Sequence, residues 1–128
     1  MQGETDFTLE EVVGNLSLAR LSGGGWGRVM GEVGAVPAPG ERVSAYRLLT
    51  HEAAEDWRAV EVEELWTAYM GASLALETAT ETGVRHSTIE AGSGAWARIP
   101  AGGWLRIRPL GDWCLAGRIG PMQDDGLS

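Results

Sequence analysis

The sequence contains a single cysteine, no lysine and only two histidines among its 128 residues. Because Cys114 has no second thiol to pair with, no disulfide can form within the chain, which fits a reducing compartment. No apolar run approaches the roughly 20 residues that a membrane-spanning helix needs. The first six residues are acidic and polar and lack the charged-then-apolar pattern of a secretory signal. We therefore expect a cytoplasmic protein with no membrane partner.

The absence of lysine leaves all ten cations to arginine, against 18 acidic residues, and the formal net charge is −8. Affinity for nucleic acid comes chiefly from cations that neutralise phosphates, so an acidic chain is not expected to bind it. The arginine bias, together with 19 glycines, is typical of GC-rich coding. Arginine also supplies a permanently charged, forked donor for carboxylate or carbonyl oxygens.

The turn residues divide the chain into one short helix and many short strands. Thr8 and Glu11 have the spacing of a helix capping box, which predicts a helix over 8–16. Short strands separated by glycine and proline argue for an antiparallel sandwich or barrel. The expected strands cover 26–33, 44–50, 56–60, 65–70, 74–78, 85–90, 96–99, 104–108 and 113–119. The length and the 44% hydrophobic content fit one domain over 1–128, with loose tails at 1–7 and 123–128.

The segment that begins at Gly94 has the spacing of a known signature. Gly94, Pro100 and Gly102 occupy the fixed positions of G-x5-P-x-G-x2-H, and Leu105 stands where the histidine belongs. This spacing resembles the second signature of the cupin barrel.

An upstream segment resembles the first cupin signature, H-x-H-x(3,4)-E-x6-G. Glu64 and Gly71 reproduce its carboxylate and its glycine. Counting back from Glu64 places Arg58 and Val60, or Trp57 and Ala59, at the two histidine positions.

Longer stretches resemble one cupin family in particular, a family of small uncharacterised proteins catalogued as a domain of unknown function. The resemblance covers about residues 9–121. It is carried by GGWGR at 24–28, AYRLLT at 45–50, DWR at 56–58, EELWTAYMG at 63–71, IPAGGW at 99–104 and RPLGDW at 108–113. The fold it implies is all-β, a cupin jelly-roll β-barrel with one short N-terminal helix. It also implies a homodimer, a pocket in the barrel mouth, and metal-binding or epimerase-like chemistry.

The departures from the family pattern fall on its polar pocket positions. The family's histidines are replaced by Arg58, Thr67 and Leu105, and Val60 occupies another cupin ligand position. Of the general cupin ligand set only Glu64 remains. A transition metal normally needs three or four good ligands, so we expect no metal and no other cofactor.

Glu64 is the first candidate catalytic residue, and its role decides between the functional alternatives. In an extended strand Glu64 shares a face with Trp66 and Ala68, and in the cupin register that face lines the barrel. An inward carboxylate costs several kcal/mol unless it is paired, and Arg58 is the obvious partner. Three roles are therefore open for Glu64. It forms a structural ion pair that fills a vacated metal site, it acts as a general acid or base, or it lies at the rim.

Other candidates surround this pair. Tyr69 is the second candidate catalytic residue, because its hydroxyl could assist Glu64. An inward arginine would bind an anionic or carbonyl oxygen, and several tryptophans could form an aromatic wall. The candidate substrate-binding residues are Arg58, Trp66, Trp104, Tyr46, Arg28, Leu105 and Trp57.

These observations favour a metal-independent cupin enzyme that cyclises, isomerises or dehydrates a hydrophobic small molecule, as in bacterial natural-product pathways. The alternative is a non-catalytic cupin that binds a small molecule or has a structural role. A third hypothesis, sugar-nucleotide epimerase chemistry, normally needs a histidine base that this pocket lacks.

Overall fold

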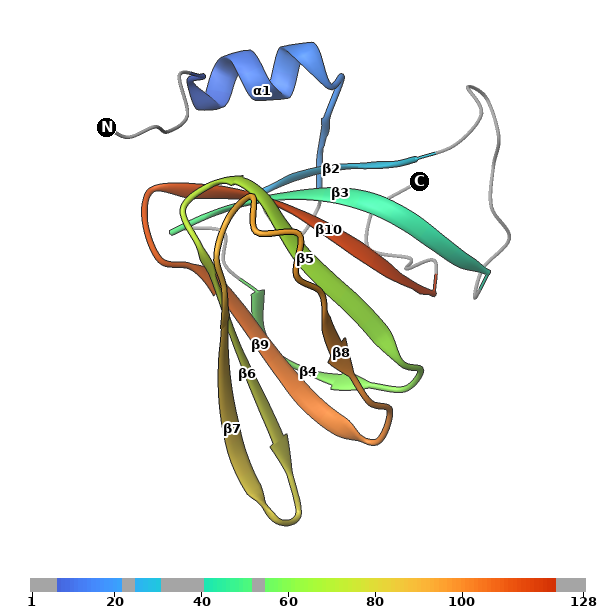
Figure 1. Cartoon of the computed structure of the whole chain (residues 1–128). Helices are drawn as coiled ribbons and strands as arrows, with labels where there is room; N and C mark the ends of the chain where they lie inside the picture. The colour runs from blue at the N-terminus through green and yellow to red at the C-terminus, as the bar shows by residue number, and fades with distance from the viewer. Residues whose placement is uncertain (1–6, 22–24, 31–40, 52–54, 122–128) are drawn as a thin grey trace.

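The structure, a computed structural model, describes residues 7–21, 25–30, 41–51 and 55–121. These residues form one short helix and ten strands (Figure 1). In chain order they are α1 (Leu9–Asn15), β1 (Ala19–Arg20), β2 (Trp26–Val29), β3 (Arg42–Thr50), β4 (Glu55–Val60), β5 (Glu64–Gly71), β6 (Leu74–Thr80), β7 (Gly83–Ile89), β8 (Ala97–Ile99), β9 (Gly103–Pro109) and β10 (Trp113–Pro121).

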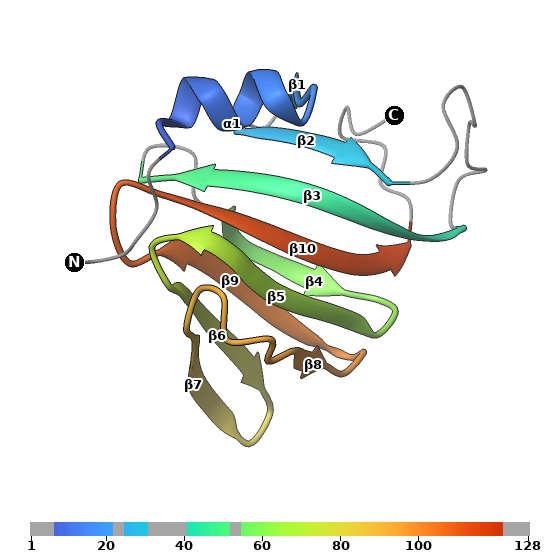
Figure 2. The ribbon, with the colours of Figure 1, turned by 45° about the horizontal axis from the view of Figure 1, so that its top comes forward.

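The strands form two antiparallel sheets that face each other (Figure 2). The six-stranded sheet has the order β1-β2-β3-β10-β5-β8, and the four-stranded sheet has the order β4-β9-β6-β7. From β3 onward the chain changes sheet after every strand except β6, which continues into β7 as a hairpin. This arrangement confirms the predicted all-β jelly roll with one short helix.

The strand positions agree with the predicted ones, with one addition. The two-residue strand β1 was not predicted, and it pairs with Trp26 and Gly27 of β2. The strand expected over 26–33 ends at Val29, and residues 31–33 lie outside the described part of the chain. The expected tails lie outside it too, except for Phe7, which is exposed.

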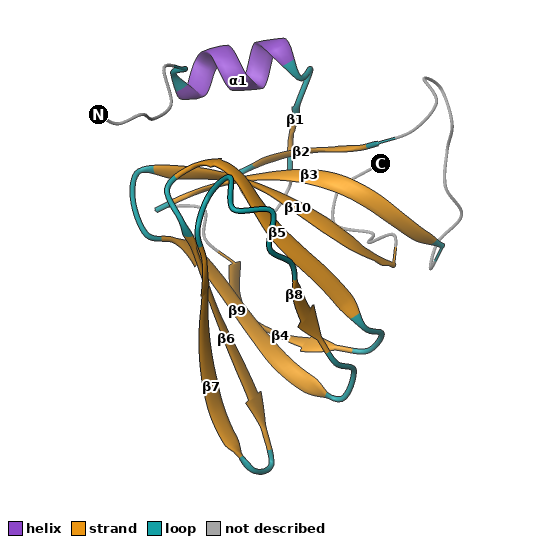
Figure 3. Cartoon of the chain, in the orientation of Figure 1, coloured by secondary structure: helices purple, strands orange, loops and turns teal. Residues whose placement is uncertain are grey.

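Helix α1 begins with the predicted capping box. The backbone N–H of Glu11 donates to the Thr8 hydroxyl, and the Thr8 N–H donates to the Glu11 carboxylate at 2.9 Å. The helix buries Val12 against Leu48 and Leu115 on the outer face of the six-stranded sheet (Figure 3). None of the described residues forms a helix long and apolar enough to cross a membrane.

The main core lies between the two sheets and fills the middle of the barrel with apolar side chains. A bulge opposite Leu115 and Ala116 interrupts the pairing of β5 with β10. Glu64, Trp66 and Ala68 therefore face inward, whereas Met70 packs with the outer cluster. The inner cluster contains Leu49, Val60, Trp66, Ala68, Leu74, Leu76, Ile89, Ile99, Leu105, Ile107, Cys114 and Ala116.

Gly71 ends β5 in a conformation that only glycine adopts easily. Its φ is +87°, and a Cβ placed on it would lie 2.6 Å from the Trp113 carbonyl oxygen and 2.7 Å from the Trp113 ring. This close approach explains why the E-x6-G spacing ends in glycine.

We predict that Gly71→Ala lowers the free energy of unfolding by about 2 kcal/mol or more, because a left-handed φ costs about 1–2 kcal/mol and the overlap with Trp113 adds to it. Urea unfolding measures the change. The matched control is Gly14→Ala in α1, where a Cβ meets nothing within 4 Å and alanine favours the helix by roughly 0.5–1 kcal/mol. Equal effects of the two substitutions would contradict the close-approach argument.

Candidate functional site

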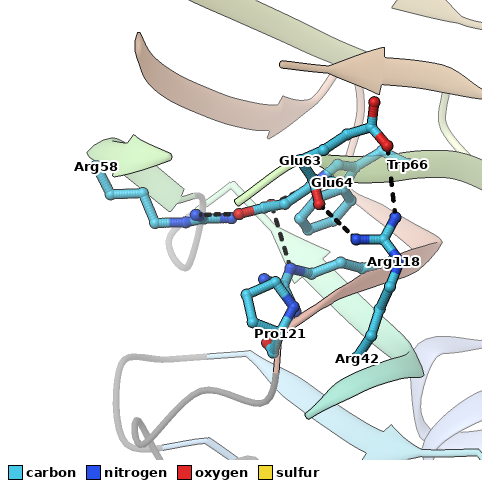
Figure 4. A network of polar contacts seen from close by, with 7 residues as sticks. All are labelled: Arg42, Arg58, Glu63, Glu64, Trp66, Arg118 and Pro121. Atoms are coloured by element: carbon cyan, nitrogen blue, oxygen red, sulfur yellow. Dashed lines mark hydrogen bonds and ion pairs between the residues drawn. The ribbon is translucent and has the colours of Figure 1, made fainter. Parts of the chain in front are cut away.

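Glu64 carries the buried carboxylate at the centre of the candidate site. It is the first residue of β5, its side chain points between the sheets, and only 2% of its surface is exposed (Figure 4). Beside it, Gly120 leaves room for a large neighbour, because a Cβ there would lie 2.8 Å from an Arg118 nitrogen. A buried carboxylate must find hydrogen-bond donors or lose its charge.

Three side chains donate hydrogen bonds to Glu64. Arg58, from β4 in the opposite sheet, forms a fork in which each terminal nitrogen lies 2.6 Å from one carboxylate oxygen. The Trp66 indole nitrogen donates at 3.0 Å, and Nε of Arg118 donates at 3.2 Å. Arg118 also donates to the backbone oxygen of Pro121 at 3.0 Å. We call Glu64, Arg58, Arg118 and Trp66 the ion cluster.

The strand register explains why these groups meet. Trp66 and Arg118 are direct partners on β5 and β10, and Glu64 lies two residues before Trp66 on the same face. Arg58 pairs with Leu105 on β9 and points across the barrel from the other sheet. The cluster therefore joins the two sheets by an ion pair.

The arginines keep Glu64 charged in spite of its burial. Desolvation by burial raises its pKa, but the hydrogen bonds and charges of Arg58 and Arg118 outweigh it and lower the pKa from 4.5 to about 2. Burial in turn lowers the pKa of Arg118, and Glu64 opposes that change. Two guanidiniums and one carboxylate leave one net positive charge in the cluster.

Comparison with known protein families identifies the family of this chain. The family model described as "Cupin superfamily (DUF985)" matches residues 10–120. The chain belongs to this cupin family. Among curated proteins the comparison finds no match.

Solved structures resemble this cupin in fold. A protein from Shewanella oneidensis has 18% sequence identity and a TM-score of 0.75, over 94% of this chain and 82% of its own. A hypothetical protein from Leishmania major has 16% identity and a TM-score of 0.73, over 90% and 81%. An oxalate decarboxylase has 19% identity and a TM-score of 0.62, over 84% of this chain and 27% of its own.

The side chains at the cupin ligand positions do not fit a metal. Val60 and Leu105 belong to the apolar core, and Arg58 places a fixed cation against both oxygens of Glu64. Within the described ranges, no three His, Cys, Asp or Glu side chains converge. A cation at this position would have to displace Arg58 and would find a single carboxylate.

The structure brings four of the predicted site residues together and separates the others. Arg58, Glu64 and Trp66 belong to the ion cluster, and Leu105 is the strand partner of Arg58. Tyr69 does not join them, because its ring lies over Gly117 on the outer face of the six-stranded sheet. Alternation along β5 and the bulge explain that placement.

The remaining predicted residues also face away from Glu64. Tyr46 packs edge-on against Tyr69, with ring centroids 6.0 Å apart, and the Arg28 guanidinium lies 5.5 Å from the Tyr46 ring. In the four-stranded sheet, Trp57 stacks with Arg106 on the outer face, and Trp104 is 53% exposed. These residues therefore do not form one aromatic wall around Glu64.

Sequence reasoning missed Arg118. Its side chain is fully buried, and it is the only charged residue in the segment CLAGRIG at 114–120. An arginine on the inward parity of an apolar strand is the signal that could have identified it. On the same strand and parity, burial raises the pKa of the Cys114 thiol to about 12, which leaves it unreactive.

A cavity of about 450 Å³ opens at the end of the barrel beside the β6–β7 hairpin. Its walls come from β6, β7, β8 and the start of β9. It adjoins the ion cluster, because Ile99 of β8 both lines the cavity and pairs with Glu64. The apolar core fills the barrel centre, so this cavity lies beyond the core, at the end of the barrel where the hairpin turns.

We predict that Glu64→Gln lowers the free energy of unfolding by about 3–5 kcal/mol, because it leaves two arginines without their counter-charge. The matched control is Glu63→Gln, since Glu63 pairs with Arg42 and Arg98 at the surface, where an ion pair is worth about 0–1 kcal/mol. Denaturant unfolding of both variants gives the comparison. A loss in Glu64→Gln no larger than that in the control would show that the cluster contributes little.

Acidification should remove the stabilisation that the charged Glu64 contributes. The pKa of Glu64 is lowered on folding, so its contribution is complete above about pH 4.5 and is lost as the pH falls towards 2. A shift from 4.5 to about 2 corresponds to about 3 kcal/mol. We predict that the free energy of unfolding of the wild-type protein falls between pH 5 and pH 2 more steeply than that of Glu64→Gln. Parallel pH profiles for the two proteins would refute this assignment.

Proposed function

We propose that this cupin is a metal-independent small-molecule-binding protein in which the ion cluster occupies the place of the metal centre. The observation that carries the proposal is the fork between Arg58 and Glu64, with both nitrogen–oxygen distances at 2.6 Å. Glu64, the one residue retained from the cupin ligand set, is already paired with the guanidinium of Arg58.

The geometry favours binding over catalysis by Glu64. A general acid or base works best when its pKa lies near the working pH, whereas the pKa of Glu64 is about 2. Both of its oxygens accept hydrogen bonds from the cluster, so a substrate would have to compete with Arg58 for them. Tyr69, the other candidate catalytic residue, lies on the opposite face of the sheet.

The cavity beside the hairpin provides the binding capacity. Its volume of about 450 Å³ lies within the range of small-molecule pockets, which hold roughly 300–1,000 Å³. Its walls combine apolar side chains such as Ile99 and Ala97 with hydroxyls and guanidiniums. This mixture suits a ligand that has an apolar body and a small polar group.

The test is thermal unfolding of the purified full chain with excess EDTA, or with Zn²⁺, Mn²⁺, Ni²⁺ or Fe²⁺. We predict the same unfolding temperature in all five conditions, because the cluster offers no open ligand set. A small-molecule panel should contain compounds that raise the unfolding temperature by several degrees, since a ligand at 100 times its Kd adds about 2.7 kcal/mol. Mass spectrometry of the same mixtures should detect no conversion.

Two outcomes would overturn the proposal. One is a rise of the unfolding temperature in the presence of a metal ion, if EDTA reverses the rise and Glu64→Gln abolishes it. The other is turnover of a panel compound that requires Glu64 and follows an ionisation near neutral pH. Glu63→Gln serves as the surface control in both measurements.

A further inference from the structure

We propose that the cavity beside the β6–β7 hairpin binds the carboxylate group of a small organic acid and that Arg85 is the side chain that holds it. The inference deepens the proposed function, on which it rests, by naming the ligand class and the binding residue.

The lining of the cavity has a charge opposite to that of the protein. The chain carries 18 acidic and 10 basic residues, yet the cavity contains two arginines and neither aspartate nor glutamate. Its other polar side chains are hydroxyls. It is lined by Thr78, Ala79, Thr80, Thr82, Gly83, Arg85, Ser87, Ala97, Arg98, Ile99, Pro100, Gly103 and Trp104. A wall of cations and hydroxyl donors without carboxylates selects an anion.

The strand register fixes the side of the sheet on which Arg85 lies. Arg85 pairs with Thr78, Thr78 with Leu105, and Leu105 with Arg58, so these four form one row across the four-stranded sheet. Leu105 is buried in the core and Arg58 reaches Glu64 between the sheets. Since paired residues share a face, Arg85 and Thr78 lie on the inner side of the four-stranded sheet, at a level where Arg85 is exposed to solvent.

The inner face of the hairpin changes from apolar to polar along its length. The pair Leu74 and Ile89 is buried, and the next pair towards the tip is Leu76 and Ser87. The pair Thr78 and Arg85 follows. The hairpin is therefore polar where it lines the cavity, and the apolar side chains of the lining, Ala97 and Ile99, come from β8. This division would orient an acid with its carboxylate towards Arg85.

The polar groups of this wall are available to a ligand. In the described part of the chain, the Arg85 side chain makes no ion pair or hydrogen bond, and the hydroxyls of Thr78 and Ser87 make none either. The second arginine, Arg98, is already paired with Glu63. One free guanidinium with two free hydroxyls beside it matches a group of single negative charge.

A carboxylate fits these groups better than a phosphate does. The planar fork of arginine matches the two oxygens of a carboxylate, and one free cation balances one charge rather than two. The apolar part of the acid would lie against Ile99 and Ala97, with Trp104 at the rim. The net positive charge of the ion cluster lies next to Ile99 and adds to the attraction.

The test is a titration of the ¹⁵N-labelled full chain followed by amide NMR shifts, with benzoate, phenylacetate and hexanoate as probes. We expect at least one of them to shift the amides of Thr78, Arg85 and Ser87 in a saturable way. Benzamide, the neutral counterpart of benzoate, and inorganic phosphate should each bind at least tenfold more weakly. Arg85→Gln should weaken binding about 10- to 100-fold, which is the usual effect of losing a charge-assisted pair.

The matched control is Arg108→Gln. Arg108 lies on β9, is exposed, and does not line the cavity, so this variant makes the same charge change elsewhere. We expect its affinity for the probes to stay within twofold of wild type.

Four results would overturn the inference: no shift at the three amides with any acid at 20 mM, equal binding of benzoate and benzamide, tighter binding of phosphate, or equal effects of the two arginine variants. The comparison of benzoate with benzamide uses wild-type protein and does not depend on the variants. The metal and EDTA measurements test the ion cluster separately, so a failure of the carboxylate inference can be told apart from a failure of the proposed function.

Discussion

The ion pair between Glu64 and Arg58 is the contact on which the arrangement of this barrel depends. It joins the two sheets, since Glu64 begins β5 in one and Arg58 lies on β4 in the other. A carboxylate that is 98% buried would be costly alone, and the fork from Arg58 with the bond from Arg118 makes the charged form the stable one. The space around the pair is shaped to it, because a side chain at Gly120 would collide with Arg118.

The cluster places a cation near the retained carboxylate as a metal centre would, but the cation is part of the chain. A cupin metal site needs several ligands that converge on an ion from solution, whereas Arg58 supplies a permanent charge and two directed donors. Val60 and Leu105 then add to the core, where histidines would need polar partners. Both charges of the pair belong to the chain, so the pair forms when the protein folds.

Much of this could be predicted from the sequence, because glycines, prolines and the retained glutamate keep fixed spacings along the chain. The jelly roll, the capping box at Thr8 and the proximity of Arg58 to Glu64 follow from such local patterns. Arg118 does not, since it reaches Glu64 through the pairing of β5 with β10, 54 residues apart in sequence. The prediction of an aromatic wall was wrong for a related reason. Strand alternation directs Tyr69 and Trp57 outward, and a family motif does not show which face of a strand a residue occupies.

The row Arg58, Leu105, Thr78 and Arg85 connects the ion cluster with the proposed anion site. At one end the Arg58 guanidinium is paired with Glu64, and in the middle Leu105 belongs to the apolar core. At the far end a second guanidinium, that of Arg85, lines an open cavity. Arg47 adds positive charge on the inner side. Desolvation is the main cause that lowers the pKa of the buried Arg118, and the charges of Arg58 and Arg47 lower it further. The inside of the barrel is thus rich in arginine within a protein of net charge −8, and an anion that enters exchanges an acidic surface for a positive interior. Since the glutamate is held by its own partners, the attraction left for a ligand is concentrated at Arg85.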